Sequence, residues 1–389
     1  MILDRAVPTA AHVITTTIAV GGESDAVAVN PLTGSVYIAS QLDNTVSVIS
    51  GQASAVSATI AVGNPQGMAV NPLTGDVYVT NFDDGAVSVI SGQTHAVSAT
   101  IGVGCLPIAV AVNPLTGDVY VTNFSDGTVS VISGQSHKVI ATIGVGTSPY
   151  GVAVSQLTGD VYVTNFSDGT VSVISGQTHE VIATIVVGTS LIGVAVSQLT
   201  GDVYVTDFSD GTVSVICGRT HAVTATIVVG NGPIGVAVNP PTGAVYVTNV
   251  KNGTVSVICG QTHEVTATIA VGNGPVGIAV NPLTGAVYTA NIGDENVSVI
   301  SVLRLSRYGR AGPAARRSCQ RRRLLAEAPW ACAHACGPPL QPVSRSTTTL
   351  IALAGAPSNS EVASRSAGSD RPSAFSRSSR AAMFGALAV

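Results

Sequence analysis

One repeated sequence pattern runs through most of this chain and restricts its fold more than any other feature. The motif NPLTG, or a variant of it, ends in glycine seven times, at Gly34, Gly75, Gly117, Gly159, Gly201, Gly243 and Gly285. The spacing between these glycines is 41 residues once and 42 residues five times. A unit of this length cannot bury its apolar surface alone and stacks on its neighbours. The sequence therefore predicts an array of seven similar units.

Each unit has the pattern of four short β-strands joined by turns. Residues 151–190 show it best, as GVAVSQLTGDVYVTNFSDGTVSVISGQTHEVIATIVVGTS, in which four β-branched apolar runs alternate with turn residues. LTGD supplies a glycine for a left-handed turn position, and SDGT places Asp before Gly as in tight hairpins. No segment has a helical period. Four antiparallel strands in about 42 residues are typical of a β-propeller blade.

The middle strands of each unit are apolar on both faces, which suits a blade that lies between two neighbouring blades. One tyrosine recurs in the second strand of every unit, and these rings are expected to pack between blades. They are Tyr37, Tyr78, Tyr120, Tyr162, Tyr204, Tyr246 and Tyr288.

Counting the strands predicts how the ring closes. The VAV, VYVT and VSVI strands each occur seven times, but the ATIxVG strand follows only the first six units. Its seventh copy is HVITTTIAVG, residues 12–21, which precedes the first unit. The N-terminal strand should therefore complete blade 7 and remove two open sheet edges. The expected organisation is an N-terminal extension over 1–11, an all-β, seven-bladed propeller over 12–301, and a separate tail over 302–389.

The repeat resembles the YVTN family of β-propeller proteins. The resemblance rests on VYVTN at 77–81, 119–123 and 161–165, followed by TVSVIS and by ATIxVG at the blade end, and it covers residues 12–301. It implies a bacterial or archaeal protein that is secreted or lies at the cell surface, with an undefined partner. The family carries no universal catalytic motif, so the resemblance assigns no active-site residues. Ser40 in blade 1 and Asp207 in blade 5 depart from the asparagine of the motif.

Charge divides the chain into two unlike parts. Residues 1–301 hold four basic and eighteen acidic residues, a net charge of −14, whereas residues 302–389 hold thirteen arginines and three acidic residues, a net charge of +10. The acidic propeller is a poor candidate for binding nucleic acid. The tail is rich in Arg, Ala, Ser and Pro without periodicity, which predicts disorder. Its composition also resembles GC-rich DNA read out of frame.

Targeting and membrane signals are absent from the chain as written. No run of 18 or more apolar residues predicts a membrane-spanning helix. The first residues, MILDRAVPTA, lack the basic and then apolar pattern of a signal peptide. The family resemblance thus predicts an extracellular location, although no signal peptide is visible in the sequence.

Residues that recur in every blade are expected to serve the blade rather than a single active site. The recurring histidines, His12, His95, His137, His179, His221 and His263, are spread around the rim and cannot converge on one metal ion. The aspartates of the SDG turns are interpreted as turn formers, with calcium binding as the alternative. Cys105, Cys217 and Cys259 are predicted to be free thiols.

A partner or ligand site is expected where the repeat is broken. Glu23 and Asp25 of blade 1 and Asp294 and Glu295 of blade 7 occupy loops on one face at the closure seam. Two interpretations are open: a solvated acidic rim, or a site for a cation such as calcium or for a basic partner. Tyr150 and Asp207 are further irregularities expected on the same interaction face.

The sequence favours a binding scaffold, without a catalytic role or a cofactor, that acts as a monomer on an unknown protein or surface ligand. No nucleophile elbow, phosphate loop or zinc-binding helix motif is present. The alternatives are a lactonase-like hydrolase with its site on the axial face, and a degenerate gene product whose tail is unselected.

Overall fold

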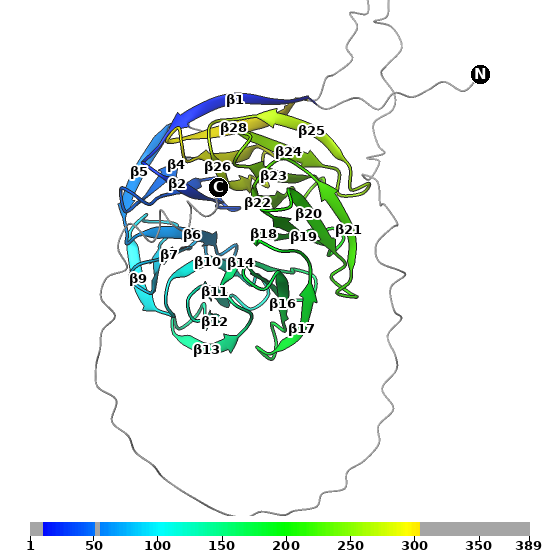
Figure 1. The fold of residues 1–389 in the computed structure, drawn as a ribbon. Coiled ribbons are helices and arrows are strands. Elements are labelled where there is room, and N and C mark those ends of the chain that lie inside the picture. Colours follow the sequence, from blue (N-terminus) through cyan, green and yellow to red (C-terminus); the bar gives the residue numbers. More distant parts are fainter. Residues whose placement is uncertain (1–10, 51–54, 304–389) are drawn as a thin grey trace, which may run out of the picture. The chain divides into compact units, whose positions relative to one another are not determined.

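The computed structural model describes residues 11–50 and 55–303, which form a ring of seven four-stranded antiparallel sheets (Figure 1). No helix is present in these residues. The all-β, seven-bladed prediction is confirmed. The predicted disordered tail, apart from residues 302 and 303, lies outside the described residues, as do residues 1–10 of the predicted extension.

Each blade uses its strands in chain order from the axis outward. The strands of blades 1 to 4 are β2 (Ser24–Val29), β3 (Val36–Ser40), β4 (Thr45–Ile49) and β5 (Val56–Ala61); β6 (Pro65–Val70), β7 (Val77–Asn81), β8 (Ala86–Ile90) and β9 (Val97–Gly102); β10 (Pro107–Val112), β11 (Val119–Asn123), β12 (Thr128–Ile132) and β13 (Val139–Gly144); and β14 (Pro149–Val154), β15 (Val161–Asn165), β16 (Thr170–Ile174) and β17 (Val181–Val186).

The strands of blades 5 to 7 follow the same order, except that the chain's first strand supplies the outer strand of blade 7. They are β18 (Leu191–Val196), β19 (Val203–Asp207), β20 (Thr212–Ile216) and β21 (Val223–Val228); β22 (Pro233–Val238), β23 (Val245–Asn249), β24 (Thr254–Ile258) and β25 (Val265–Ala270); and β26 (Pro275–Val280), β27 (Val287–Asn291), β28 (Asn296–Leu303) and β1 (Ala11–Ala19).

Closure occurs as the strand count predicts. β1 pairs with β28 in antiparallel register, from Ala11 opposite Leu303 to Ala19 opposite Asn296, with one irregularity between Ile14 and Thr16. β28 ends at Leu303, two residues beyond the predicted end of the propeller. The chain runs from β1 directly into blade 1, so the pairing of β1 with β28 joins blade 7 to blade 1 and closes the ring. It also covers the edge of β28 that would otherwise be unpaired.

The hydrophobic core lies between blades. Every second and third strand is almost wholly buried, whereas the outer strands β9, β13, β17, β21 and β25 bury one isoleucine each. Each of the seven apolar clusters combines two adjacent blades; in one, Tyr162 and Val171 of blade 4 pack with Val203 and Val205 of blade 5. Burial on both faces explains why these strands carry continuous apolar runs.

A repeated hydrogen bond ties the inner strands of neighbouring blades. The threonine of the VYVTN pattern donates its hydroxyl to a carbonyl of the next blade's inner strand, as from Thr164 to Ile192 at 2.8 Å. The same contact joins Thr80 to Ile108, Thr122 to Tyr150, Thr206 to Ile234 and Thr248 to Val276, at 2.8–2.9 Å. These bonds link blades 2 to 7 in succession through their inner strands.

Candidate functional site

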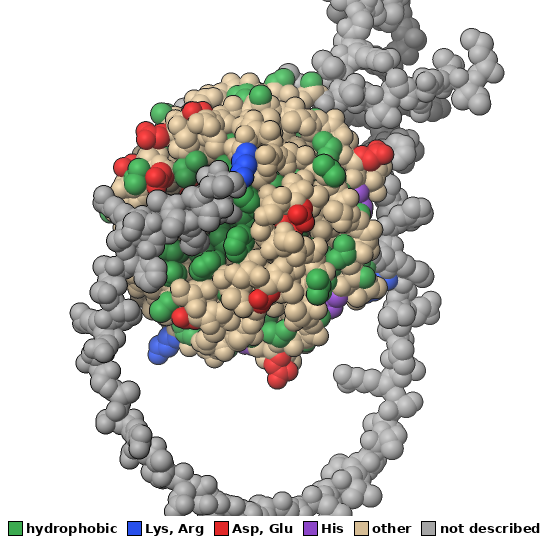
Figure 2. Space-filling view, viewed as in Figure 1, with side chains coloured by type: hydrophobic (Ala, Val, Ile, Leu, Met, Phe, Trp, Pro, Cys, Tyr) green, Lys and Arg blue, Asp and Glu red, His purple; other side chains and the backbone are tan. Residues whose placement is uncertain are grey.

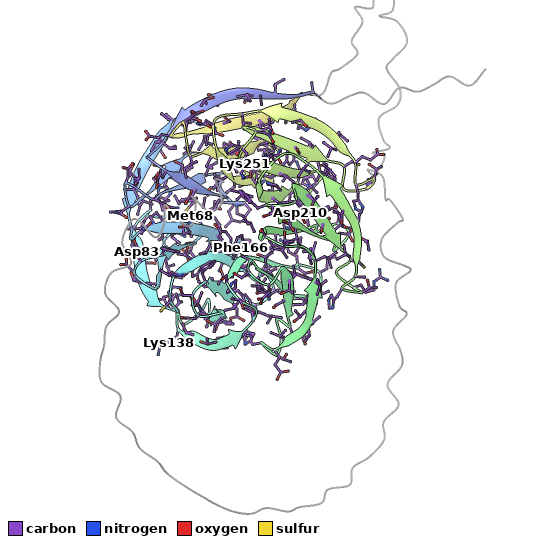
Figure 3. The ribbon with its side chains drawn as sticks, viewed as in Figure 1. Met68, Asp83, Lys138, Phe166, Asp210 and Lys251 are labelled. Atoms are coloured by element: carbon purple, nitrogen blue, oxygen red, sulfur yellow. The ribbon has the colours of Figure 1, made fainter. Side chains whose placement is uncertain are left out.

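The loops of the ring lie on two opposite faces. The front face, which is toward the viewer in Figures 1 to 3, is formed by the loops that link consecutive blades and by the loops between second and third strands. The back face is formed by the loops between first and second strands and between third and fourth strands. The part of the chain described by the structure contains no helix long and apolar enough to cross a bilayer.

The aspartates of the SDG position hold the front-face loops together. In blade 3, Asp126 Oδ2 accepts the Cys105 backbone N–H at 2.7 Å, which joins the incoming loop to the hairpin turn. Asp43, Asp168 and Asp294 make the equivalent bond to Gly22, Thr147 and Asn273 at 2.6–3.0 Å. The role of this residue is thus a bridge between two loops, which goes beyond the turn formation predicted from the sequence.

The structure does not bring the four predicted seam carboxylates together as one set of metal ligands. Asp25 is 4% exposed, and its Oδ2 accepts a hydrogen bond from Gln66 Nε2 at 3.0 Å, whereas Glu23 and Glu295 are exposed. Asp294 holds the Asn273 loop as described above. Among the described residues, no group of three or more His, Cys, Asp or Glu side chains is placed to hold a metal ion.

Glu23 and Glu295 still make the seam acidic. Both have positive φ angles, 47° and 51°, and their backbone carbonyls accept the N–H groups of Gln41 and Val20. Figure 2 shows acidic side chains gathered over the sector where β1, β4 and β28 lie. Glu23 and Glu295 are thus solvated acidic side chains at the seam, whereas Asp25 is buried, and the choice between an acidic rim and a site for a basic partner stays a prediction.

Asp207 was predicted on the interaction face, and this prediction is wrong because the side chain is buried, with 2% of it exposed. Its Oδ2 accepts the Thr189 N–H at 2.7 Å, and its Oδ1 accepts the N–H groups of Ser209 and Asp210 at 3.2 Å. In this blade Asp207 therefore bridges the two loops in place of the SDG aspartate. Three N–H donors stabilise the carboxylate and keep it from a partner.

Tyr150 is half-buried on the front face, at the centre of an aromatic group. Its ring lies edge-on to Phe124, with centroids 6.3 Å apart and an interplanar angle of 87°, and it lies tilted against Phe166 at 6.4 Å. Phe124 belongs to blade 3 and Phe166 to blade 4, so the group spans two blades. We call Phe124, Tyr150 and Phe166 the aromatic group. Only Tyr150 was identified from the sequence.

The aromatic group is followed around the front face by a cation–π pair. Lys251 Nζ lies 4.9 Å from the ring centroid of Phe208, and Lys251 is exposed. Figure 3 places Phe166 and Lys251 toward the middle of the ring, and Figure 2 shows hydrophobic side chains around the centre of this face. The missed signal was a phenylalanine after VYVT(N/D) in four consecutive blades, at Phe82, Phe124, Phe166 and Phe208.

The repeated histidines lie toward the back face and contact tyrosines of the preceding blade. Five of them face the tyrosine ring edge-on, with centroids 6.0–6.3 Å apart, in the pairs Tyr37–His95, Tyr78–His137, Tyr120–His179, Tyr162–His221 and Tyr204–His263. His12 of β1 makes the same contact with Tyr246, and burial lowers the pKa of His12. These contacts confirm the prediction that the tyrosines pack between blades.

Burial raises the pKa of the seven repeated tyrosines. The pKa of Tyr120 and of Tyr162 rises to about 12, and that of Tyr204 rises further, chiefly because the ionised phenol would lose its hydration. Nearby Asp118, Asp160 and Asp202 add to the rise. Tyr162 and Tyr204 also donate their hydroxyls to the Gly218 and Gly260 carbonyls of the next blade at 3.2 and 3.4 Å.

Alkaline unfolding should report on these tyrosines. Folding keeps each hydroxyl protonated at pH values where an unfolded tyrosine, of pKa 10.0, ionises, so the associated stability is intact below pH 10 and is lost toward pH 12. In a pH titration, tyrosinate absorbance should rise in the same step as the loss of the circular dichroism signal. Tyr204→Phe, which keeps the ring, should reduce the amplitude of this step. Titration of the tyrosines near pH 10 in a still-folded chain would contradict this account.

The cysteine prediction is partly wrong. Cys105 and Cys259 are free, as predicted. Cys217 is almost fully buried and is disulfide-bonded, so the prediction of a free thiol fails at this position.

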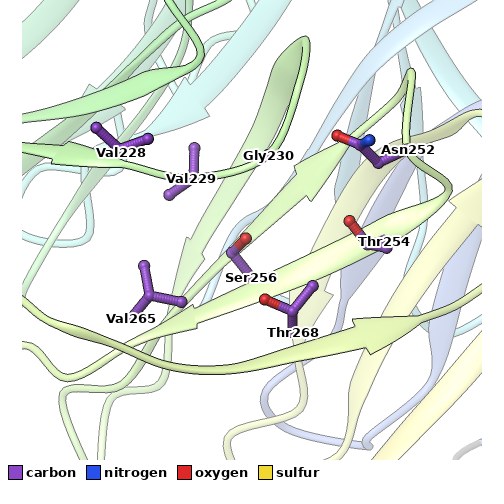
Figure 4. A pocket seen from close by; sticks show the side chains of 8 residues that line it. All are labelled: Val228, Val229, Gly230, Asn252, Thr254, Ser256, Val265 and Thr268. Carbon is purple, nitrogen blue, oxygen red and sulfur yellow. The ribbon is translucent and has the colours of Figure 1, made fainter.

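A pocket of about 330 Å³ lies at the outer edge of the ring, between blades 5 and 6 (Figure 4). Its wall consists of Val228, Val229, Gly230, Asn252, Thr254, Ser256, Val265 and Thr268. None of these side chains titrates near neutral pH. The pocket therefore offers apolar contact and hydroxyl hydrogen bonds, without a general acid or base.

Comparisons with known proteins identify the fold alone. No protein-family model and no curated protein matches the chain. A chain of the Kuenenia stuttgartiensis hydrazine synthase superposes with a TM-score of 0.66 at 18% identity, over 79% of this chain and 99% of that chain. The β-propeller domain of Cps50 (Swd1) from Myceliophteria thermophila superposes with a TM-score of 0.64 at 12% identity, over 75% of this chain and 100% of that domain. At such identities the shared property is the β-propeller architecture.

Proposed function

We propose that this propeller is a binding scaffold without a catalytic role, which acts as a monomer at the cell surface or after secretion. It holds a protein or a surface ligand on its front face. The observation that carries the proposal is the aromatic group of Phe124, Tyr150 and Phe166, next to the Phe208–Lys251 pair. Partly exposed aromatic rings beside a cation are the side chains that contribute most to protein interfaces.

The composition of the face supports binding more than chemistry. The six histidines of the described residues contact tyrosines toward the back face, away from the aromatic group. The front-face aspartates of blades 1, 3, 4 and 7 accept backbone N–H groups of neighbouring loops. Regular loops of this kind form a rigid platform, which lowers the entropic cost of binding.

Location and partner class rest on the sequence. The repeat resembles YVTN proteins, whose members are secreted or surface proteins, and this resemblance supports an extracellular role. The acidic balance, with Lys138, Arg219 and Lys251 as the basic residues of the described part, argues against a nucleic-acid partner.

The chain's two lysines provide a direct test of the front face. Lys251 lies on the front face and Lys138 on the outer edge of the back face, and the sequence contains no other lysine. The full chain is incubated with a surface extract of the cells that produce it and treated with an amine-reactive cross-linker. We expect a partner to be cross-linked to Lys251. The yield of cross-links at Lys138, on the other face, gives the background level for comparison.

Tyr150→Ile should weaken this attachment at least about tenfold, because aromatic anchors often contribute 2 kcal/mol or more. Isoleucine is the native residue at the matching position in blades 3, 5 and 6, as Ile108, Ile192 and Ile234, so the variant should fold. Asp207→Asn, which restores the repeat's own residue at a buried site, is the matched control and should bind like the parent. Attachment through Lys138 alone, or equal capture by Tyr150→Ile, would refute the front-face assignment.

A further inference from the structure

Six leucines form an exposed ring on the back face, opposite the aromatic group. They occupy the NPLTG turns between first and second strands and are 58–65% exposed: Leu32, Leu73, Leu115, Leu157, Leu199 and Leu283. Blade 6 has Pro241 at this position. Single exposed leucines are common on protein surfaces, but a set repeated in six blades of one ring is a concentrated apolar surface. We call these six residues the leucine ring.

The turn itself holds each leucine outward. In blades 1, 2, 3 and 7 the backbone N–H of the leucine donates to the Oδ1 of the asparagine two residues earlier, at 2.9 Å, as from Leu115 to Asn113. This side-chain bond fixes the turn. The leucine Cδ1 also reaches toward the next blade, so that a Cβ built on Gly201 would lie 3.4 Å from Leu157 Cδ1. The leucine ring is thus built by the repeat and does not depend on a mobile loop.

Carboxylates accompany the leucine ring on one side only. The residue after the turn glycine is Asp76, Asp118, Asp160 and Asp202 in blades 2 to 5, whereas blades 1, 6 and 7 carry Ser35, Ala244 and Ala286. Asp76, Asp118 and Asp160 are partly exposed. Asp202 is only 8% exposed, so the back face combines an apolar ring with an acidic sector of three consecutive blades, 2 to 4.

We propose that the leucine ring and its acidic sector form a second interaction surface, which binds a protein segment carrying apolar side chains together with lysine or arginine. Charge complementarity selects this occupant. A second copy of the chain would bring its own acidic sector to the interface, and the described residues hold only three basic residues to offset it. A phospholipid surface would strip water from the carboxylates without supplying a fixed cation for each.

The surface is independent of the front face, and binding there can be measured separately. The probe is a fluorescent amphipathic peptide made of leucine and lysine, and its binding to the full chain is followed by anisotropy. A matched peptide with glutamine in place of lysine is the control ligand. We expect the lysine peptide to bind more tightly, and added salt to weaken its binding, since exposed ion pairs are screened.

Two variants separate the apolar and the acidic contributions. Leu115→Ser combined with Leu157→Ser should weaken the binding of the lysine peptide at least tenfold, because two exposed apolar contacts are lost. Asp76→Asn, Asp118→Asn and Asp160→Asn together should weaken it about tenfold and should remove most of the difference between the two peptides. Tyr150→Ile, on the front face, should bind the peptide like the parent. Each variant is compared only after its circular dichroism spectrum matches that of the parent.

Three results would overturn the proposal. Equal binding of the lysine and glutamine peptides, or binding unaffected by both back-face variants, would show that neither charge nor the leucine ring selects the ligand. A parent dimer in sedimentation that Leu115→Ser with Leu157→Ser dissociates would identify a second copy as the occupant. Flotation of the parent with phosphatidylcholine vesicles, lost in the same variant, would identify a lipid surface.

Discussion

Removing residues 1–19 from the full chain should abolish the single cooperative unfolding transition of the propeller and lower its melting temperature by at least about 10 °C. These residues include β1, which pairs with β28 over its whole length. Without β1, the backbone groups of β28 become an open sheet edge, and Ile18, which is 4% exposed, no longer fills the core between blades 7 and 1. Loss of one such isoleucine side chain alone costs about 2–5 kcal/mol.

Three comparisons assign this effect to β1. A chain that lacks only residues 1–10 keeps β1, so it distinguishes the contribution of the strand from that of the residues before it. This shorter truncation should melt like the parent. Thr17→Ala, at an exposed position of β1, should change the free energy of unfolding by less than about 0.5 kcal/mol. A synthetic peptide of residues 11–22, added to the truncated chain, should restore part of the lost stability. An unchanged melting curve in the truncated chain would show that the ring does not need β1.

The closure of the ring could be predicted from the sequence because it depends on counting. The ATIxVG pattern is missing after blade 7 and present before blade 1, and a four-stranded blade admits one placement for the extra copy. The core could be predicted for a similar reason. Strands buried on both faces lose the polar alternation of a half-exposed strand, and the VYVTN and TVSVI segments are indeed almost wholly buried.

The candidate site could be predicted only in part, because it depends on which loops meet in space. Asp207 breaks the repeat, and a break in a loop was interpreted as an exposed functional residue. The Asp207 carboxylate is buried because it accepts the N–H of Thr189, which lies in a loop 18 residues earlier. The spacing of residues in the sequence does not reveal this contact. Phe124 and Phe166 are regular members of the repeat, yet with Tyr150 they form the aromatic group. A repeated residue can thus acquire a local role when its neighbour changes.

Gly193→Val should destabilise the propeller by about 3 kcal/mol or more and lower its melting temperature by about 10 °C, because the inner strands of blades 5 and 6 leave no room for a side chain there. A Cβ on Gly193 would fall well inside 3.0 Å of the Ile234 carbonyl oxygen. That oxygen cannot move away freely, since it accepts the Thr206 hydroxyl at 2.9 Å, and Thr206 Oγ1 in turn accepts the Gly193 N–H at 2.8 Å. Valine must therefore part the two blades or break this pair of buried hydrogen bonds.

The repeat supplies matched comparisons for this variant. Glycine recurs at the equivalent position as Gly67, Gly151, Gly235 and Gly277, but blade 1 has Ala26 and blade 3 has Ala109. One methyl group can thus be accommodated where the inner strands adjust, so Gly193→Ala should cost less than Gly193→Val. Ala109→Gly should cost at most about 1 kcal/mol, through chain entropy alone. If Gly193→Val has the same melting temperature as the parent, this account is wrong. Side-chain packing in the outer layers would then set the spacing of the inner strands, and the threonine hydrogen bonds would adapt to it.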